Sequence, residues 1–168
     1  MIRVIRIPQD EAEALSQTML SNLASMQEAV GGMIEFITVD PIKASLMVDE
    51  QAKLYGKPIN RKATLLWWLL EPAARQRDVI AGDALVVGCP DKMGDTTSAP
   101  DEVIELLLET ACYKAEFQTY DDPNKFNGNL RRFTDYFEAA NYALLKAQAW
   151  NAVERVRVVS AEDIKDCA

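Results

Sequence analysis

The sequence predicts an α+β protein in which one mixed or mostly antiparallel sheet is covered by helices. The first observation is the order of the elements, which is strand, helix and two strands with short connections, followed by helices, without regular β-α-β alternation. The second is composition: 49% of the 168 residues are hydrophobic, enough for a core that buries roughly 70% of the unfolded chain's surface.

The N-terminal half supplies most strands of this sheet. Residues 2–7 alternate as a strand does, and Pro8 ends them. Asp10 and Glu13 have capping-box spacing, and apolar residues spaced by three and four then predict one helix that ends at the glycine pair 31–32. The following elements are predicted as strands at 33–39 and 44–49, a hairpin return at 53–55, a helix at 61–70 and a strand at 84–88.

The sequence pattern of the C-terminal half mainly predicts helix. Residues 89–100 form a loop, and a helix follows from Asp101 with apolar residues on one face through Ala115. Further elements are a loop at 120–128, an amphipathic helix from 130 to 147, a strand at 153–159 and a frayed tail at 160–168. We therefore expect an α+β domain at 1–110 and, at 111–168, a helical extension with a terminal strand packed on the same core.

Charge and residue usage exclude several classes of function. The formal net charge of −8 argues against generic binding to nucleic-acid phosphates and to anionic membranes. The chain has no histidine, which removes histidine-based catalysis, and its three scattered cysteines predict no zinc site and no disulfide framework. No apolar run is long enough to cross a membrane. We expect a soluble cytoplasmic protein without cofactor or metal.

Four sequence marks occur in order between residues 26 and 88. They are V-G-G at 30–32, M-V-D-E at 47–50, G-K-P-I-N at 56–60 and G-D-A-L-V-V-G at 82–88. Together they resemble a small domain of unknown function carried by phages, plasmids and conjugative elements, over about residues 1–110. The resemblance implies an accessory gene of a mobile element, among anti-restriction and host-takeover genes, and it supplies no catalytic residues.

Two groups of polar residues are candidates for ligand binding. Asn60 either caps the helix at 61–70 or meets Asp83 in one pocket, whereas Asp83 alternatively closes a turn onto backbone N–H groups. Arg155 and Arg157 share one face of the last strand. They would hold an anion if that strand paired with the first one, and otherwise they are solvated strand charges.

The candidates for partner binding are aromatic and acidic. Trp67 and Trp68 point about 100° apart on a helix, so both are buried only if the helix is covered on two sides. An exposed indole would instead be a binding hot spot. An acidic stripe, which either mimics nucleic-acid phosphates or is an ordinary solvated helix face, is predicted at Glu102, Glu105, Glu109 and Glu116.

These observations leave two kinds of function. The preferred one is a non-enzymatic accessory protein of a phage or mobile element that binds and modulates a host protein, because the standard catalytic constellations are missing from the sequence. The alternative is a small-molecule or nucleotide-binding domain, sequestering or enzymatic, that uses the region of Asn60 and Asp83.

Overall fold

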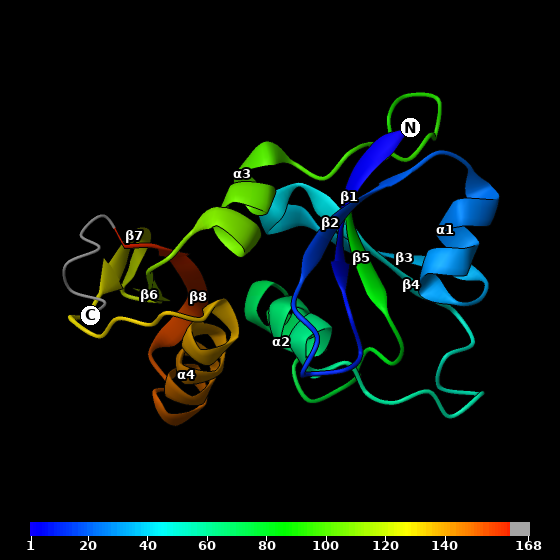
Figure 1. Ribbon diagram of the computed structural model, residues 1–168. Helices are drawn as coiled ribbons and strands as arrows, with labels where there is room; N and C mark the ends of the chain where they lie inside the picture. The colour runs from blue at the N-terminus through cyan, green and yellow to red at the C-terminus, as the bar shows by residue number, and fades with distance from the viewer. Residues whose placement is uncertain (162–168) are drawn as a thin grey trace. The chain divides into compact units, whose positions relative to one another are not determined.

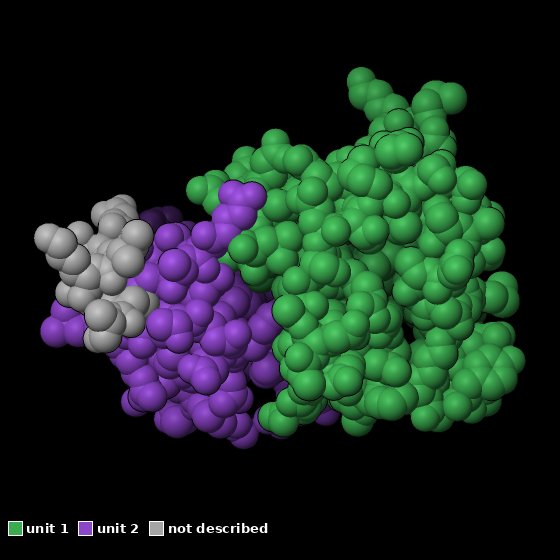
Figure 2. Space-filling model, in the orientation of Figure 1, with its two compact units in different colours: residues 1–64, 78–108 green, residues 65–77, 109–168 purple. Residues whose placement is uncertain are grey.

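The computed structural model describes residues 1–161 and confirms the α+β class. The chain divides into two compact units, drawn in two colours in Figure 2. Unit 1 comprises residues 1–64 and 78–108, and unit 2 comprises residues 65–77 and the chain from 109 onward.

Unit 1 is built on a five-stranded sheet in which every neighbouring pair is antiparallel. The order is β2-β1-β5-β4-β3. The strands are β1 (Ile2–Ile7), β2 (Ser16–Leu20), β3 (Ile34–Val39), β4 (Ala44–Asp49) and β5 (Ala84–Gly88). The three central strands are almost entirely buried, so their apolar runs form the middle of the core.

Helices cover this sheet on both faces, as predicted. Helix α1 (Leu23–Val30) lies on one side and α3 (Asp101–Ile104) on the other (Figure 1). A π-helical turn, η3 (Glu105–Glu109), continues α3, and a short 3₁₀ turn, η1 (Asp40–Ile42), joins β3 to β4. The core beneath α1 consists of Val4, Leu20, Val30, Met47, Leu85 and Val87.

Unit 2 has its own three-stranded antiparallel sheet of order β7-β6-β8. Its strands are β6 (Tyr113–Thr119), β7 (Asp122–Gly128) and β8 (Val153–Ser160). Helix α4 (Tyr136–Ala149) packs against β6 and β8 and is capped by Asp135, whose carboxylate accepts two backbone N–H bonds. Unit 2 also takes in most of α2 (Arg61–Leu70) and the 3₁₀ turn η2 (Pro72–Ala74).

The predicted long helix before the glycine pair is wrong in its first half. Strand β2 forms there instead and pairs with β1 along the edge of the sheet. The capping box lies at Asn22 and Ser25, not at Asp10 and Glu13. Backbone pairing with β1 outweighs the helical spacing of a few apolar residues, because that spacing is only a weak local preference.

Four further predictions, three of them in the C-terminal half, also need correction. The helix from Asp101 ends at Glu109, and the stretch after it is strand β6. Residues 122–128, predicted as a loop, form strand β7, while residues 53–55 are a turn and not a hairpin return. Helix α4 starts at Tyr136, later than predicted. The extension therefore holds a sheet as well as a helix and a terminal strand.

The described chain contains no helix that is long and apolar enough to cross a membrane. Cys89 is a free thiol, whereas Cys112 is disulfide-bonded. The cysteine spacing had predicted no disulfide framework, and Cys112 departs from that prediction. Apart from its first two residues, the predicted frayed tail lies outside the described residues.

Candidate functional site

Asn60 lies inside unit 1 and caps helix α2. Its side-chain oxygen accepts a hydrogen bond from the Ala63 N–H at 3.0 Å, which satisfies one of the open N–H groups at the helix start. Its amide nitrogen donates to the carbonyl oxygens of Ile7 at 2.8 Å and Gly82 at 3.0 Å. The residue is 0% exposed. The predicted cap is confirmed, and this side chain ties together the ends of β1, β5 and α2.

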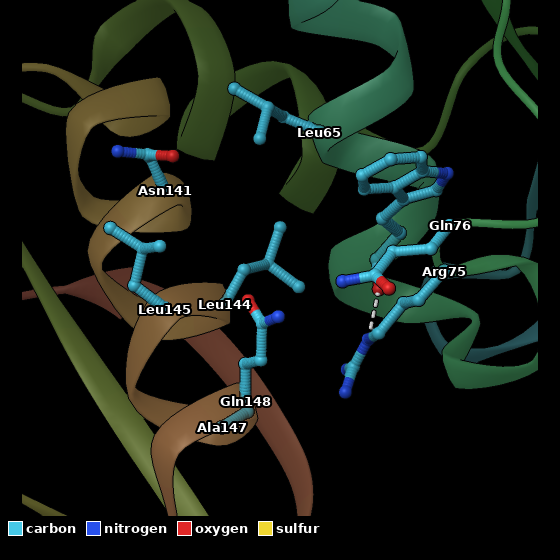
Figure 3. Close-up of a pocket in the computed structure, with 9 residues that line it drawn as sticks. Leu65, Arg75, Gln76, Asn141, Leu144, Leu145, Ala147 and Gln148 are labelled. Atoms are coloured by element: carbon cyan, nitrogen blue, oxygen red, sulfur yellow. Dashed lines mark hydrogen bonds between the residues drawn. The ribbon is translucent and has the colours of Figure 1, made fainter.

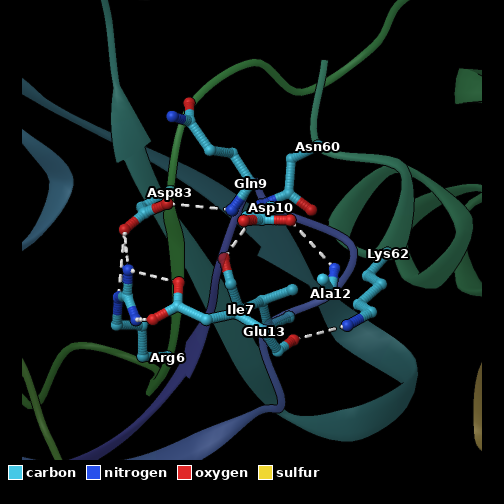
Figure 4. Close-up of polar contacts among 9 residues, drawn as sticks. All are labelled: Arg6, Ile7, Gln9, Asp10, Ala12, Glu13, Asn60, Lys62 and Asp83. Carbon is cyan, nitrogen blue, oxygen red and sulfur yellow. Dashed lines mark hydrogen bonds and ion pairs between the residues drawn. The ribbon is translucent and has the colours of Figure 1, made fainter. Parts of the chain in front are cut away.

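Asp83 lies beside Asn60, because Asn60 binds the carbonyl of the preceding residue, Gly82. One carboxylate oxygen of Asp83 accepts the Gln9 N–H at 2.8 Å, and the other accepts two N–H groups of Arg6 at 2.6 and 3.0 Å (Figure 4). Arg6 also binds Glu13 at 3.1 Å. The hydrogen bonds that Arg6 donates to Glu13, and then those that it donates to Asp83, raise the pKa of Arg6. Asp83 thus fixes the segment after β1.

A buried ion pair explains the remaining marks. The Lys57 ammonium lies 2.7 Å from the Asp49 carboxylate and donates to the carbonyl oxygens of Val30 and Gly31, at the end of α1. Burial favours a higher pKa for Asp49, but the hydrogen bonds from Lys57 and the Gln51 N–H outweigh it, and the pKa is lowered. Gly32 is required beside them, since an added Cβ would stand 2.3 Å from the Asp49 Oδ1.

The sequence marks therefore meet at one end of the sheet of unit 1. The pocket expected from the functional interpretation of Asn60 and Asp83 stays a prediction, and both side chains are hydrogen-bonded to the scaffold. These hydrogen bonds and the Lys57–Asp49 ion pair explain the marked residues as residues that determine the fold of unit 1.

Arg155 and Arg157 lie on the same exposed face of β8, as predicted. Strand β8 does not pair with β1, because the two strands belong to different sheets. Arg157 binds the carboxylate of Glu116 through Nε at 2.8 Å and Nη2 at 2.6 Å, and its guanidinium lies 4.0 Å from the Phe126 ring centre. Arg155 stands opposite Gln118. The anion site that required pairing of the terminal strands is not formed.

The acidic stripe is shorter than predicted. Glu102, Glu105 and Glu109 are exposed on α3 and η3. Glu116 belongs to strand β6, where it is 9% exposed and paired with Arg157 and Lys114. Three carboxylates therefore remain on the surface of this helical segment.

Trp67 and Trp68 are both half-buried on α2. Trp68 lines a pocket of about 250 Å³ in unit 2, here called the Trp68 pocket. Leu144 and Gln148 of α4 lie on one side of it, and Arg75 and Gln76 lie on the other (Figure 3). The full lining is Leu65, Trp68, Arg75, Gln76, Asn141, Leu144, Leu145, Ala147 and Gln148.

Arg75 gives this pocket a fixed polar wall. Its Nε donates to the carbonyl oxygen of Trp68 at 2.6 Å and its Nη2 to that of Leu69 at 3.2 Å, which satisfies carbonyls at the end of α2. Burial lowers the pKa of Arg75. The site thus combines an apolar floor with a rim of one guanidinium and three amides.

A second pocket, of about 270 Å³, was not predicted. We call it the Trp150 pocket, and its lining is Phe117, Thr119, Asn127, Gly128, Asn129, Tyr142, Lys146 and Trp150. The spacing of Tyr142, Lys146 and Trp150 by four residues was the available signal, because such residues share one helix face. The strand residues opposite them were not accessible to sequence reasoning.

Among residues 1–161, no three histidine, cysteine, aspartate or glutamate side chains are grouped as metal ligands would be. No match was found among curated proteins or among solved structures. A family model described as "Domain of unknown function (DUF3846)" matches residues 2–111, close to the range of the predicted resemblance. The match spans all the marks that build unit 1 and ends just before β6. The chain therefore belongs to the DUF3846 family.

Proposed function

We propose that the protein is a non-enzymatic accessory protein of a phage, plasmid or other mobile element that binds and modulates a host protein in the host cytoplasm. The observation that carries the proposal is the Trp68 pocket. The partner places an apolar side chain in it, against the half-buried indole.

The size and lining of the pocket favour a protein partner. Its volume of about 250 Å³ suits a single anchoring side chain. Apolar side chains at the floor, Leu65 and Leu144 among them, are surrounded by the polar rim of Arg75, Asn141 and Gln148. Tryptophan in an apolar pocket with a polar rim is the common composition of an interface hot spot.

The net charge of unit 1 is a second, independent observation that supports the same proposal. Its sequence holds 15 acidic and 8 basic residues, a net charge of −7. The exposed carboxylates of Glu102 and Glu105 contribute to this charge. A surface of one sign accelerates encounter with a partner of the opposite sign, so we expect a basic host protein.

The alternative ligand site at Asn60 and Asp83 has less support. Asn60 is 0% exposed and is hydrogen-bonded to three backbone groups, so a ligand would have to displace the cap of α2. Asp83 is held by Arg6 and the Gln9 N–H.

The test compares two leucines of unit 2. Leu145 lines the Trp68 pocket and is 57% exposed, whereas Leu130 is 93% exposed and is not among the lining residues. We expect wild type and Leu130→Arg to capture the same stoichiometric protein from host lysate. Leu145→Arg should lower the affinity for that purified protein about tenfold or more, since truncated or blocked hot spots cost ~2 kcal/mol.

Failure to capture a stoichiometric partner, or equal affinity for Leu145→Arg and wild type, would refute the proposal. Both arginine variants should have unchanged thermal unfolding, which separates a lost contact from a lost fold.

A further inference from the structure

The Trp150 pocket differs from the Trp68 pocket in having aromatic walls. Phe117 of β6 and Tyr142 of α4 meet edge to face, with ring centres 6.5 Å apart and planes at 74°. Trp150, just after α4, is 51% exposed and lines the same pocket. A half-exposed indole in the same lining as two packed rings offers a flat surface on which a planar ring stacks.

Asparagine side chains occupy the strand side of the pocket. Asn129 donates to the Tyr142 hydroxyl at 2.8 Å and accepts the Arg131 N–H at 3.0 Å, so it holds the phenol ring in place. Asn127 stands opposite Phe117 in the β6–β7 pairing and is exposed. Its amide supplies one acceptor and two donor hydrogens for the edge of a bound ring.

Two cations lie at the same phenol ring. The Arg131 guanidinium carbon is 4.6 Å and the Lys146 Nζ 5.8 Å from the ring centre of Tyr142. Within residues 1–161, neither has a carboxylate within 4 Å. Arg157 of the same unit also lies over a ring, but Glu116 neutralises it. Of the two cations, Lys146 lines the Trp150 pocket, and its charge favours an anion there.

We propose that the Trp150 pocket binds a planar aromatic anion, whose ring stacks on Trp150 and whose charged group meets Lys146. The volume of about 270 Å³ limits the ligand to a small ring system with one charged substituent. A mononucleotide and an aromatic carboxylate both have this chemistry. This site is separate from the Trp68 pocket, and the inference does not rest on the proposed function.

The test is calorimetric titration of the full chain with adenosine and uridine monophosphates and with indole-3-acetate. At least one of these should bind once per chain, with a dissociation constant of about 1 mM or tighter. Uridine, adenosine and inorganic phosphate should each bind about tenfold more weakly or not at all, since each lacks half of the recognised chemistry. Preference for the nucleotides or for the carboxylate identifies the source of the ligand.

Three variants locate the binding. Trp150→Ala and Lys146→Gln should each weaken it about tenfold, while Arg155→Gln, which removes an exposed cation elsewhere in unit 2, should leave it unchanged. Trp150→Phe should restore part of the affinity if stacking is the cause. No binding of any aromatic anion, equal binding of the uncharged nucleosides, or an equal loss in Arg155→Gln would overturn the proposal.

Discussion

The two units use charged and aromatic residues in opposite ways. Unit 1 contains 2 of the 13 aromatic residues and a net charge of −7, whereas unit 2 contains the other 11 and has 10 basic against 11 acidic residues. In unit 1 the singled-out polar side chains are hydrogen-bonded to the scaffold, as Asn60 and Asp49 show. In unit 2 aromatic residues and cations line pockets. The difference teaches that the residues of the family marks form internal contacts of unit 1, whereas aromatic and basic residues of unit 2 line its pockets.

The largest expected effect is at the centre of unit 1. Asn60→Ala removes a helix cap and leaves two buried carbonyls without their donor, so we expect a loss of about 3 kcal/mol in the free energy of unfolding. Asn22→Ala, which removes the exposed cap of α1, should cost about 1 kcal/mol. Urea unfolding measures the free energy of unfolding of both variants. Equal destabilisation by Asn60→Ala and Asn22→Ala would show that the marked residues do not stabilise unit 1 more than an ordinary helix cap does.

A smaller effect, with a defined pH dependence, is expected at the buried pair. Lys57→Met should cost about 2 kcal/mol at neutral pH, because it leaves the Asp49 carboxylate buried without its cation. The pKa of Asp49 is lowered from 3.8 in the folded protein, so the stability from this pair is present above about pH 4 and is lost as the pH falls through the folded pKa.

Unfolding curves of wild type and Lys57→Met from neutral to acidic pH test this sign. The difference between the two proteins should stay constant down to about pH 5 and then shrink. A difference that grew on acidification would contradict the assigned direction of the pKa shift.

The smallest effect is expected in unit 2. Arg157→Gln should cost about 1 kcal/mol, since it removes the partner of the nearly buried Glu116 but the guanidinium itself is half-exposed. Arg155→Gln should change stability by less than about 0.5 kcal/mol. Chemical unfolding of the two variants shows whether the open face of this sheet depends on one ion pair. If Arg155→Gln lowered the free energy of unfolding as much as Arg157→Gln, the ion pair with Glu116 would not explain the effect of Arg157.

Sequence reasoning succeeded where local chemistry decides the structure. Helix α2 and strands β4 and β5 have the predicted bounds, because Asn60 supplies a cap and the strands are short apolar runs between turn residues. It failed at β2 and β6, whose strand character comes from pairing with β1 and β8. Such pairing involves residues distant in the chain, which periodicity within one segment does not report.

The candidate sites show the same limit. Trp67 and Trp68 were candidates because neighbouring indoles on a helix point about 100° apart, whereas the leucines of α4 that line the Trp68 pocket were not. The Trp150 pocket joins a helix to two strands, and only its helical side, from Tyr142 to Trp150, has a recognisable spacing. For Asn60 and Asp83, the sequence does not reveal that the Ile7 carbonyl and the Arg6 guanidinium already bind their side chains.

The glycine at position 32 has a consequence for the divergence of relatives. Because its missing side chain leaves the room that the aspartate at position 49 occupies, a larger residue at 32 would require that carboxylate to shift or be replaced by a smaller side chain. Its replacement would remove the ion-pair partner of the lysine at 57. We therefore expect a relative with a larger residue at 32 to differ at 49 and 57 as well.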